Sequence, residues 1–501
     1  MRKSLFLSIA ILAVFLVYSS FINNGFSWLD HGDIERGRAL LPLVKLPSAF
    51  ISRFGQTGFF RPLVTVINSV DFALYGLWAP GFHLTNVILH LAATFAAAVF
   101  LARLFAFSFK EKLLVFFIVG LHPLAFLPVG AVSYRQELLL ALFTYLTLYF
   151  HRRKKLLPAA LCFLAALFSK ETALFLLPVL ILLFDRLYLW EIALLFIYGW
   201  LRFLAVPEIW HTTATVLPLS EALGTRITAV SKLALQLLLP LKPSLSDAAA
   251  IVPLTDIKII PAAALFALLI FSFRRFHPSL KKAVILLTIL LLPALNIIPV
   301  PRFSSPHYGY VVLPALAALV LLFRKWCLKR YKSATICNFL VVIWLIISGF
   351  STFRAGFQFK NDLTLFGPEV AADGRFLEGH QYLGDYYFKT NEFEKAEIHY
   401  ELALKKDPEV IAFVDEGSTM NNLAGVYLAQ KKLTEADGLL AALSRKPGWN
   451  ENQNLIYNRA LIAANQDDWR KVIELLNRGD IQWNRPEPLL LLERAREIIR
   501  E

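Results

Sequence analysis

Long apolar runs separated by short polar turns dominate the first part of the chain. The runs predict helices over residues 4–21, 83–105, 112–129, 136–151, 155–169, 172–184, 189–205, 259–273, 281–299, 307–324 and 335–351. Many approach the length needed to cross a bilayer. Another apolar stretch, Ile227 to Leu241, has polar edges and is expected to be re-entrant or to lie in the interface. The pattern therefore predicts an all-α, polytopic membrane domain with about 11 spanning helices.

Beyond residue 352 the pattern changes to mixed charge with helical periodicity and an internal repeat. Apolar and small residues recur at tetratricopeptide spacing, first as Leu383, Gly384, Tyr387, Ala396, Tyr400, Ala403 and Pro408. A second copy runs from Leu423 to Leu440, a weaker third copy from Ala460 to Leu476, and a capping helix is expected over 486–500. We therefore predict a membrane domain over 1–352, a linker over 353–376 and a helical-repeat domain over 377–501.

Composition and charge agree with a membrane protein. Hydrophobic residues make up 57% of the chain and the mean hydropathy is +0.56, above the range of soluble domains. The net charge of +14 does not indicate nucleic-acid binding, because the basic residues gather in short loops such as 152–155, 274–282 and 324–332. Those loops are expected in the cytoplasm with the N-terminus, which puts the loop 22–82 and the repeats on the other side.

The three cysteines form no readable disulfide or metal pattern, and the sequence has no N-glycosylation sequon. The absence of a sequon favours a bacterial inner membrane, where the charge pattern puts the first loop and the repeats in the periplasm.

The loop 22–82 is too long for a simple connection, and such loops usually carry function. Residues 36–54 and 61–77 within it predict helices lying on the membrane surface. Its acidic stretch, Trp28 to Glu35, follows the first apolar run, where a carboxylate is costly unless it has a partner or a role.

Three roles are open for these acids. Asp30 could act as a general base, with His31 as a relay or ligand. Alternatively, Asp30, Asp33 and Glu35 could hold a divalent cation, Mg²⁺ or Mn²⁺, and no other cofactor is indicated. The third option is a solvated acidic turn that starts a helix.

Ionisable residues also occur in the predicted outer turns, where the positive-inside rule disfavours cations. The candidates for binding a phosphate-bearing substrate are His31, Arg61, His83, Arg135, Glu137, Lys170, Glu171, Arg202, Arg302 and His307. Single members could instead be structural. Arg61 could pair with Asp71, neighbouring opposite charges could form rim salt bridges, and Asn86 and His90 could join helices.

Several motifs occur in a characteristic order. They are Trp28-Leu-Asp-His, Phe60-Arg-Pro-Leu, Asp71, Gly81-Phe-His-Leu-Thr-Asn-Val-Ile-Leu-His90, Leu121-His-Pro123, Arg135-Gln-Glu137 and Phe168-Ser-Lys-Glu-Thr172. With the terminal repeats, the chain resembles the transmembrane and tetratricopeptide repeat-containing proteins, which are polytopic glycosyltransferases of the GT-C class.

The resemblance implies a GT-C-like membrane domain that transfers a sugar, a mannose-like hexose, from a polyprenyl-phosphate donor. The expected acceptor is a hydroxyl of a protein or glycan at the non-cytoplasmic face of the bilayer, and the repeats would hold the acceptor or a partner protein. The resemblance assigns the catalytic aspartate to Asp30. Leu29 departs from the paired acid that the family usually has there.

Two other classes stay open. A non-catalytic membrane scaffold would use the repeats to recruit partner proteins. An O-antigen ligase or polymerase can also carry such repeats, but it places its large outer loop late in the membrane domain. A transporter is disfavoured because no inverted repeat of broken helices is recognisable.

Overall fold

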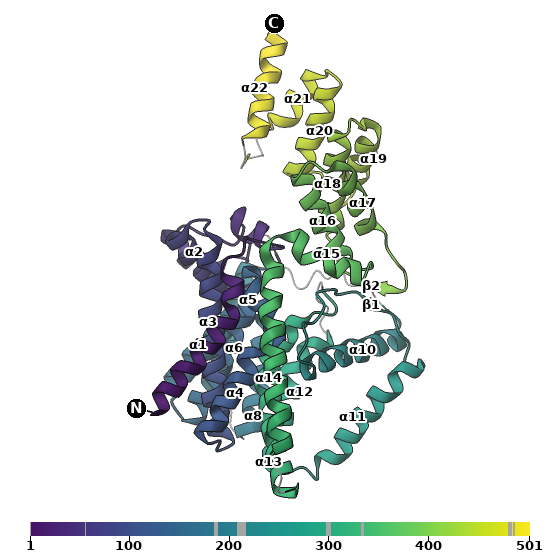
Figure 1. The fold of residues 1–501 in the computed structure, drawn as a ribbon. Helices are drawn as coiled ribbons and strands as arrows, with labels where there is room; N and C mark the ends of the chain where they lie inside the picture. Colours follow the sequence, from purple (N-terminus) through teal and green to yellow (C-terminus); the bar gives the residue numbers. More distant parts are fainter. Residues whose placement is uncertain are drawn as a thin grey trace. The chain divides into compact units, whose positions relative to one another are not determined.

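The structure, a computed structural model, describes residues 2–55, 57–184, 189–207, 217–296, 302–331, 335–478, 483 and 486–500. Over these residues the chain is almost wholly helical, which confirms the all-α prediction (Figure 1). The chain divides into two compact units. We call Met1–Leu245 with Ala249–Leu365 the apolar unit, and Ser246–Ala248 with Phe366–Glu501 the repeat unit.

The apolar unit is built from helices joined by short turns. Its elements are α1 (Arg2–Ile22), η1 (His31–Glu35), η2 (Leu43–Ile51), α2 (Pro62–Tyr75), α3 (Ala79–Leu104), α4 (Phe109–Leu121), η3 (Pro123–Ala125), α5 (Phe126–Gly130), η4 (Val132–Tyr134), α6 (Arg135–Arg152), α7 (Leu156–Ser169), η5 (Glu171–Phe175), α8 (Leu176–Phe184), α9 (Leu189–Ala205), α10 (Leu219–Leu238), β1 (Ala249–Ala250), η6 (Ile257–Ile259), α11 (Ile260–Phe273), α12 (Pro278–Leu291), η7 (Leu292–Leu295), η8 (Pro306–Val312), α13 (Leu313–Tyr331), α14 (Thr335–Gly356) and η9 (Phe357–Lys360). Every apolar run predicted to be a helix is helical over most of its described residues; the run 281–299 is described as far as Asn296.

Five helices in the described part of the chain are long and apolar enough to cross a membrane. They are Lys3–Ile22, Ala79–Leu104, Pro278–Leu295, Pro306–Arg330 and Thr335–Lys360. A sixth span results if Phe109–Leu121 and Pro123–Gly130, bent by 51° at His122, count as one. The segments Pro62–Tyr75, Leu156–Ser169 and Glu171–Phe184 are apolar but shorter, so length alone does not assign them as spans.

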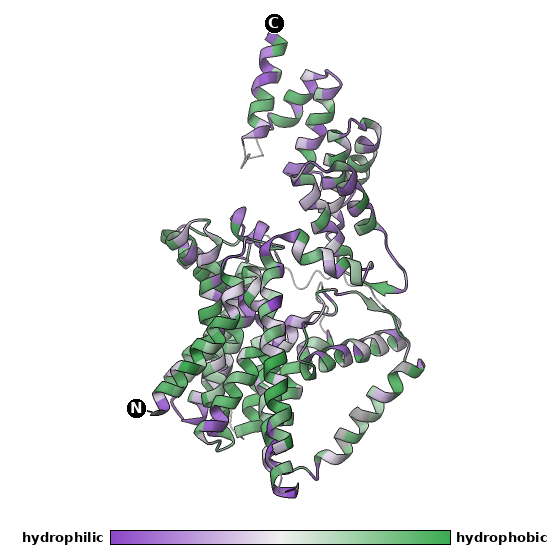
Figure 2. Cartoon of the chain, viewed as in Figure 1, coloured by the Kyte–Doolittle hydropathy of each residue, from purple (hydrophilic) through white to green (hydrophobic). Residues whose placement is uncertain are grey.

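Helices of the apolar unit differ in how much of their apolar surface other helices cover. In α3, 56% of the most apolar window is buried, whereas in α14 the share is 17%. The ribbon of α14 is nevertheless mainly hydrophobic in Figure 2, and its exposed side chains include Phe339, Ile346 and Phe350. An apolar helix that leaves most of its surface uncovered suits a lipid environment, because exposure of that surface to water is unfavourable.

Two segments differ from the prediction in detail. The predicted surface helix over 36–54 is wrong in extent, because only Leu43–Ile51 is helical and the winding there is 3₁₀, with Pro47 inside it. The second surface helix is present as α2. Residues 353–376, expected to form a linker, are largely helical.

The repeat unit is a series of paired helices. The chain enters it through α15 (Asp362–Ala372), and its elements are α16 (Leu377–Lys389), α17 (Phe393–Leu404), β2 (Val410–Ile411), α18 (Glu416–Ala429), α19 (Leu433–Ser444), α20 (Gln453–Asn465), α21 (Trp469–Leu476) and α22 (Glu487–Arg500). Three helical pairs and a final helix match the three predicted copies and the cap. Gly384 lets α16 approach α17 closely, because an added Cβ would lie 2.6 Å from the ring of Tyr400.

Candidate functional site

Asp30 lies in a closed cradle formed by the turn before α6. Its Oδ1 accepts hydrogen bonds from Ser133 N at 2.7 Å and Ser133 Oγ at 2.5 Å, and its Oδ2 accepts one from Val132 N at 3.1 Å. The residue has no exposed surface. Burial raises the pKa of Asp30 to about 6, although the three hydrogen bonds oppose the shift. A buried carboxylate with such a pKa can accept a proton near neutral pH.

A second carboxylate, Asp362, holds the acidic turn in position. Trp28 has a positive φ of 58°, and its backbone N donates to Asp362 Oδ1 at 2.8 Å. His31 lies between two acids, with Nε2 2.9 Å from Asp362 Oδ2 and Nδ1 2.5 Å from Glu35 Oε2. The structure therefore joins His31 to Glu35 and Asp362. Asp362 was missed because it follows the last apolar run and carries no local motif.

The structure does not bring Asp30, Asp33 and Glu35 together as one metal-binding group among the described residues. Asp33 Oδ1 lies 3.3 Å from Arg38 Nη2, and Glu35 binds His31. The described residues contain no group of three or more His, Cys, Asp or Glu side chains placed to hold a metal ion. Burial raises the pKa of Asp33, and the charges of Arg38 and Arg61 oppose that shift.

Arg61 pairs with Glu171, which corrects the expected pair with Asp71. The guanidinium makes two contacts, Nη2 to Oε1 at 2.9 Å and Nε to Oε2 at 3.3 Å, and lies 4.0 Å from the centre of the Phe59 ring. Burial alone would lower the pKa of Arg61, but Glu171 raises it, so the cation is retained. Arginine also binds phosphate through two parallel contacts of this kind.

Glu137 and Lys170 form a neighbouring buried pair. Lys170 Nζ lies 2.5 Å from Glu137 Oε1, and His307 Nε2 lies 3.8 Å from the same oxygen. The His307 ring packs on Tyr134 and Tyr308, with ring centres 4.9 and 4.1 Å apart. Segments far apart in the sequence thus contribute to one ionic group, which we call the acid–base cluster: Asp30, Asp33, Arg61, Glu137, Lys170, Glu171 and His307.

Arg135 has a structural environment that leaves no room for the predicted contact with a donor phosphate. It is fully buried, and its nitrogens contact Asp71 Oδ2 at 2.7 Å, Asn86 Oδ1 at 2.8 Å, Asn68 Oδ1 at 2.9 Å and Phe82 O at 3.1 Å. These partners lie on α2 and α3, so the arginine at the start of α6 joins three helices.

The other predicted site residues have different positions. His83 Nε2 contacts Gly25 O at 3.1 Å, which places His83 against the start of the first loop. The guanidinium of Arg302 lies 5.2 Å from the centre of the Trp28 ring, close to the acidic turn. Arg202 is half-buried in the last turn of α9, one turn after Tyr198, whose ring contacts Phe60.

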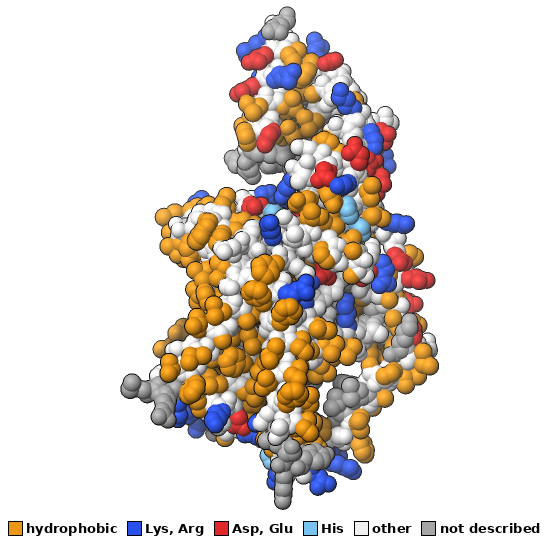
Figure 3. All heavy atoms as spheres, viewed as in Figure 1, with side chains coloured by type: hydrophobic (Ala, Val, Ile, Leu, Met, Phe, Trp, Pro, Cys, Tyr) orange, Lys and Arg blue, Asp and Glu red, His pale blue; other side chains and the backbone are white. Residues whose placement is uncertain are grey.

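The acid–base cluster lies at one end of the apolar unit. It contains residues that follow α1 and α7 and residues that begin α6 and η8, so these helix ends meet. Basic residues gather at the other end, where Lys325 pairs with Glu111 at 3.0 Å (Figure 3). The two ends of the unit therefore differ in the ionisable residues that they carry.

Comparisons with known proteins identify one part of the chain. The family model "Tetratricopeptide repeat" matches residues 377–410, which are α16, α17 and the turn after them. The crystal structure of yeast Tom70 aligns with 81% of this chain and 96% of its own, at 12% identity and a TM-score of 0.25. That score is too low to support a structural argument. No curated protein matches the sequence. The chain is thus an all-α protein in which a tetratricopeptide repeat follows an apolar helical unit along the sequence.

Proposed function

We propose that the chain is an integral-membrane glycosyltransferase that moves a sugar, a mannose-like hexose, from a polyprenyl-phosphate donor to a hydroxyl acceptor. The reaction would take place at the non-cytoplasmic face of a bacterial inner membrane. The observation that supports this proposal is the acid–base cluster, which gathers acids and cations from distant turns at the end of the apolar unit that lacks the basic loops. Such a set suits chemistry on an anionic substrate at a membrane surface.

In the proposed reaction, Asp30 accepts the proton of the acceptor hydroxyl while the hydroxyl oxygen attacks the anomeric carbon. The bond from that carbon to the phosphate oxygen breaks, and polyprenyl phosphate leaves with the bonding electrons. Arg61 and Lys170 stabilise the charge that develops on the phosphate. A single displacement of this kind inverts the configuration of the sugar.

The closed cradle around Asp30 sets a requirement for this mechanism. Because the carboxylate has no exposed surface and both oxygens accept hydrogen bonds, an acceptor reaches it only when the Val132–Ser133 turn moves away. The described conformation is therefore a closed form of the proposed enzyme. Release of one hydrogen bond to Asp30 would also raise the proton affinity of the carboxylate, as a base requires.

Turnover by the purified full chain in lipid nanodiscs tests the proposal. We expect sugar transfer from one member of a panel of polyprenyl-phosphate sugars, and a loss of about 100-fold or more in Asp30→Asn. Glu111→Gln, which changes an acid at the opposite end of the unit, serves as the matched control and is expected to keep full turnover. Equal turnover of Asp30→Asn and wild type, at equal thermal stability, would remove Asp30 from the mechanism.

The side of the membrane on which the repeat unit lies is tested separately. In a background that lacks Cys162, Cys327 and Cys337, a cysteine replacing exposed Asp437 in the repeat unit is expected to react with an impermeant maleimide in intact spheroplasts. A cysteine replacing exposed Arg153 is expected to react only after permeabilisation. The opposite pattern would put the repeats in the cytoplasm and contradict the proposed face.

A second candidate function is a non-catalytic membrane scaffold that binds a protein partner. The tetratricopeptide match at 377–410 favours it, because stacked repeats commonly present concave surfaces to other proteins. The scaffold predicts that Asp30→Asn keeps every activity of the chain, including capture of its partner. The turnover experiment therefore separates the two functions.

A further inference from the structure

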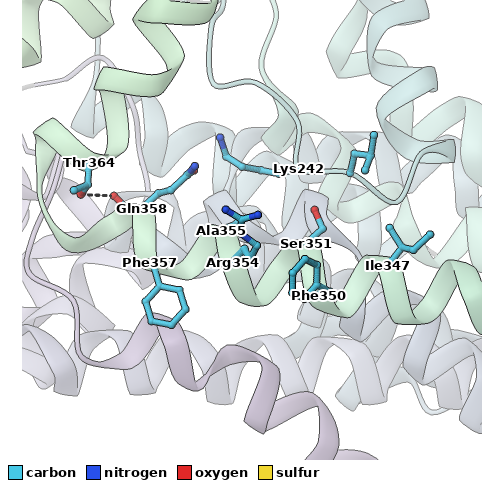
Figure 4. A pocket seen from close by; sticks show the side chains of 10 residues that line it. Lys242, Ile347, Phe350, Ser351, Arg354, Ala355, Phe357, Gln358 and Thr364 are labelled. Atoms are coloured by element: carbon cyan, nitrogen blue, oxygen red, sulfur yellow. Dashed lines mark hydrogen bonds between the residues drawn. The ribbon is translucent and has the colours of Figure 1, made fainter.

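A cavity of about 550 Å³ lies in the apolar unit, between the chain after α10 and the end of α14 (Figure 4). Its lining residues come from two stretches: Leu241, Lys242, Ile347, Phe350, Ser351, Arg354, Ala355, Phe357, Gln358 and Thr364. The volume lies within the range of small-molecule sites. None of the residues assigned to sugar transfer lines it.

The charge of this cavity has one sign. Lys242 and Arg354 both line it, and none of its ten lining residues is acidic. Figure 4 shows Lys242, Arg354 and Gln358 with their polar ends directed toward a common space. Gln358 Oε1 is buried and has no hydrogen-bond partner among the described residues, and an amide can present its oxygen or its NH₂ group to a ligand. The hydroxyl of Ser351 adds a donor.

The other wall of the cavity is hydrocarbon. Phe350 is 61% exposed and Phe357 is 57% exposed, and both lie on the uncovered face of α14 and its extension. The opposite face of the helix is fixed, since Thr352 Oγ1 donates to Leu121 O at 2.8 Å and Asn24 Nδ2 donates to Gly356 O at 2.8 Å. Arg354 on this fixed helix and Lys242 from the chain after α10 therefore lie beside an exposed apolar surface.

We propose that this cavity binds the phosphate monoester headgroup of a membrane lipid, with the hydrocarbon chain of the lipid lying along Phe350 and Phe357. Charge selects the monoester over a diester. A phosphate monoester carries about 1.5 to 2 negative charges near neutral pH and has three terminal oxygens, which matches two cations with further donors. A phosphodiester carries only about one charge and has two terminal oxygens, so its attraction to the two cations would be weaker.

Two lipids share this chemistry, polyprenyl phosphate and phosphatidic acid. Polyprenyl phosphate is also the product of the proposed sugar transfer. The site itself depends only on the cavity, its two cations and its apolar wall, so it stands whether or not Asp30 transfers a sugar.

Binding to the full chain in nanodiscs of neutral lipid tests the proposal. The probes are polyprenyl phosphate, phosphatidic acid, phosphatidylglycerol and inorganic phosphate, measured by native mass spectrometry and by competition. We expect at least one monoester lipid to bind about tenfold or more tightly than phosphatidylglycerol, and Lys242→Gln or Arg354→Gln to weaken it by about tenfold. Arg152→Gln, an exposed cation outside the cavity, is the control and is expected to leave binding unchanged.

Phe350→Ala separates the contribution of the lipid headgroup from that of the hydrocarbon chain. It should weaken the binding of the lipids and leave the binding of inorganic phosphate unchanged. Tight binding of both monoester lipids supports recognition of the headgroup. Preference for one of them shows whether the ligand is polyprenyl phosphate or phosphatidic acid. Equal binding of phosphatidylglycerol and the monoesters, or binding insensitive to both cation variants in folded protein, would overturn the proposal. If the protein transfers no sugar but still binds a monoester lipid through Lys242 and Arg354, the proposed function is wrong and the lipid site stands.

Discussion

Asp30→Asn is expected to change how the stability of the protein depends on pH. The substitution keeps the size of the side chain and removes its titration. Burial raises the pKa of Asp30 in the folded chain to about 6, against a usual aspartate value of 3.8. Since the folded state binds the proton more tightly, the stabilisation is complete below about pH 3.8 and is lost as the pH rises through about 6.

The magnitude follows from the two pKa values. At about 1.4 kcal/mol per pH unit, the gap between 3.8 and about 6 corresponds to about 3 kcal/mol. Asparagine does not titrate, and its NH₂ group facing a backbone N–H adds an offset that is constant with pH. The difference in unfolding free energy, wild type minus Asp30→Asn, should therefore fall by about 3 kcal/mol between about pH 4 and about pH 7.

The assay is thermal unfolding of both proteins in detergent, followed by tryptophan fluorescence across this pH range. Asp373→Asn is the control with the opposite sign. Burial tends to raise the pKa of Asp373, but hydrogen bonds from Arg375 and Ser246 outweigh burial and lower it. Its stabilisation is thus present at neutral pH and lost on acidification. A difference for Asp30→Asn that stays flat with pH would refute the assignment of a buried, proton-binding carboxylate.

Three further predictions concern stability. Arg135→Gln leaves Asp71 buried without its cation and should cost about 3–5 kcal/mol in denaturant unfolding, with partial recovery in the double variant with Asp71→Asn. Gly384→Ala pushes a Cβ to 2.6 Å from the facing tyrosine ring and should lower the resistance of the repeat unit to proteolysis, whereas Gly438→Ala, with no atom within 4 Å, should not. Burial and a neighbouring histidine lower the pKa of His399 to about 4, so the repeat unit should lose stability, seen as faster proteolysis, as the pH falls from about 6.5 toward 4, and His399→Gln should weaken that dependence.

Local patterns predicted the helices well, because helix formation depends on residues a few positions apart. The apolar runs and the repeat around Gly384 and Tyr400 are of this kind. The prediction of a helix over 36–54 was wrong for a local reason as well. Its amphipathic spacing suited a helix, but Pro42 and Pro47 interrupt the backbone hydrogen bonds that a continuous α-helix needs.

Pairing between distant residues was predicted less well. The sequence analysis considered Asp71 as a partner for Arg61 and Lys170 as a partner for Glu171. In the structure Arg61 binds Glu171 and Asp71 binds Arg135. An ion pair depends on which helix ends meet, and that depends on packing over the whole unit. Asp362 was unpredictable for the same reason.

The ionic contacts of Arg135 and the Arg61–Glu171 pair, both in the apolar unit, support different interpretations. Arg135 contacts four partners, which is the pattern expected of a residue that holds helices together. Glu171 is 18% exposed beside Arg61, so this pair can be reached from outside. A buried ion pair is seldom more stable than apolar side chains of the same shape. An anchor that served only to hold the repeats would need no such pair, so the Arg61–Glu171 pair, with Glu171 partly exposed, agrees with the proposed binding of an anionic substrate.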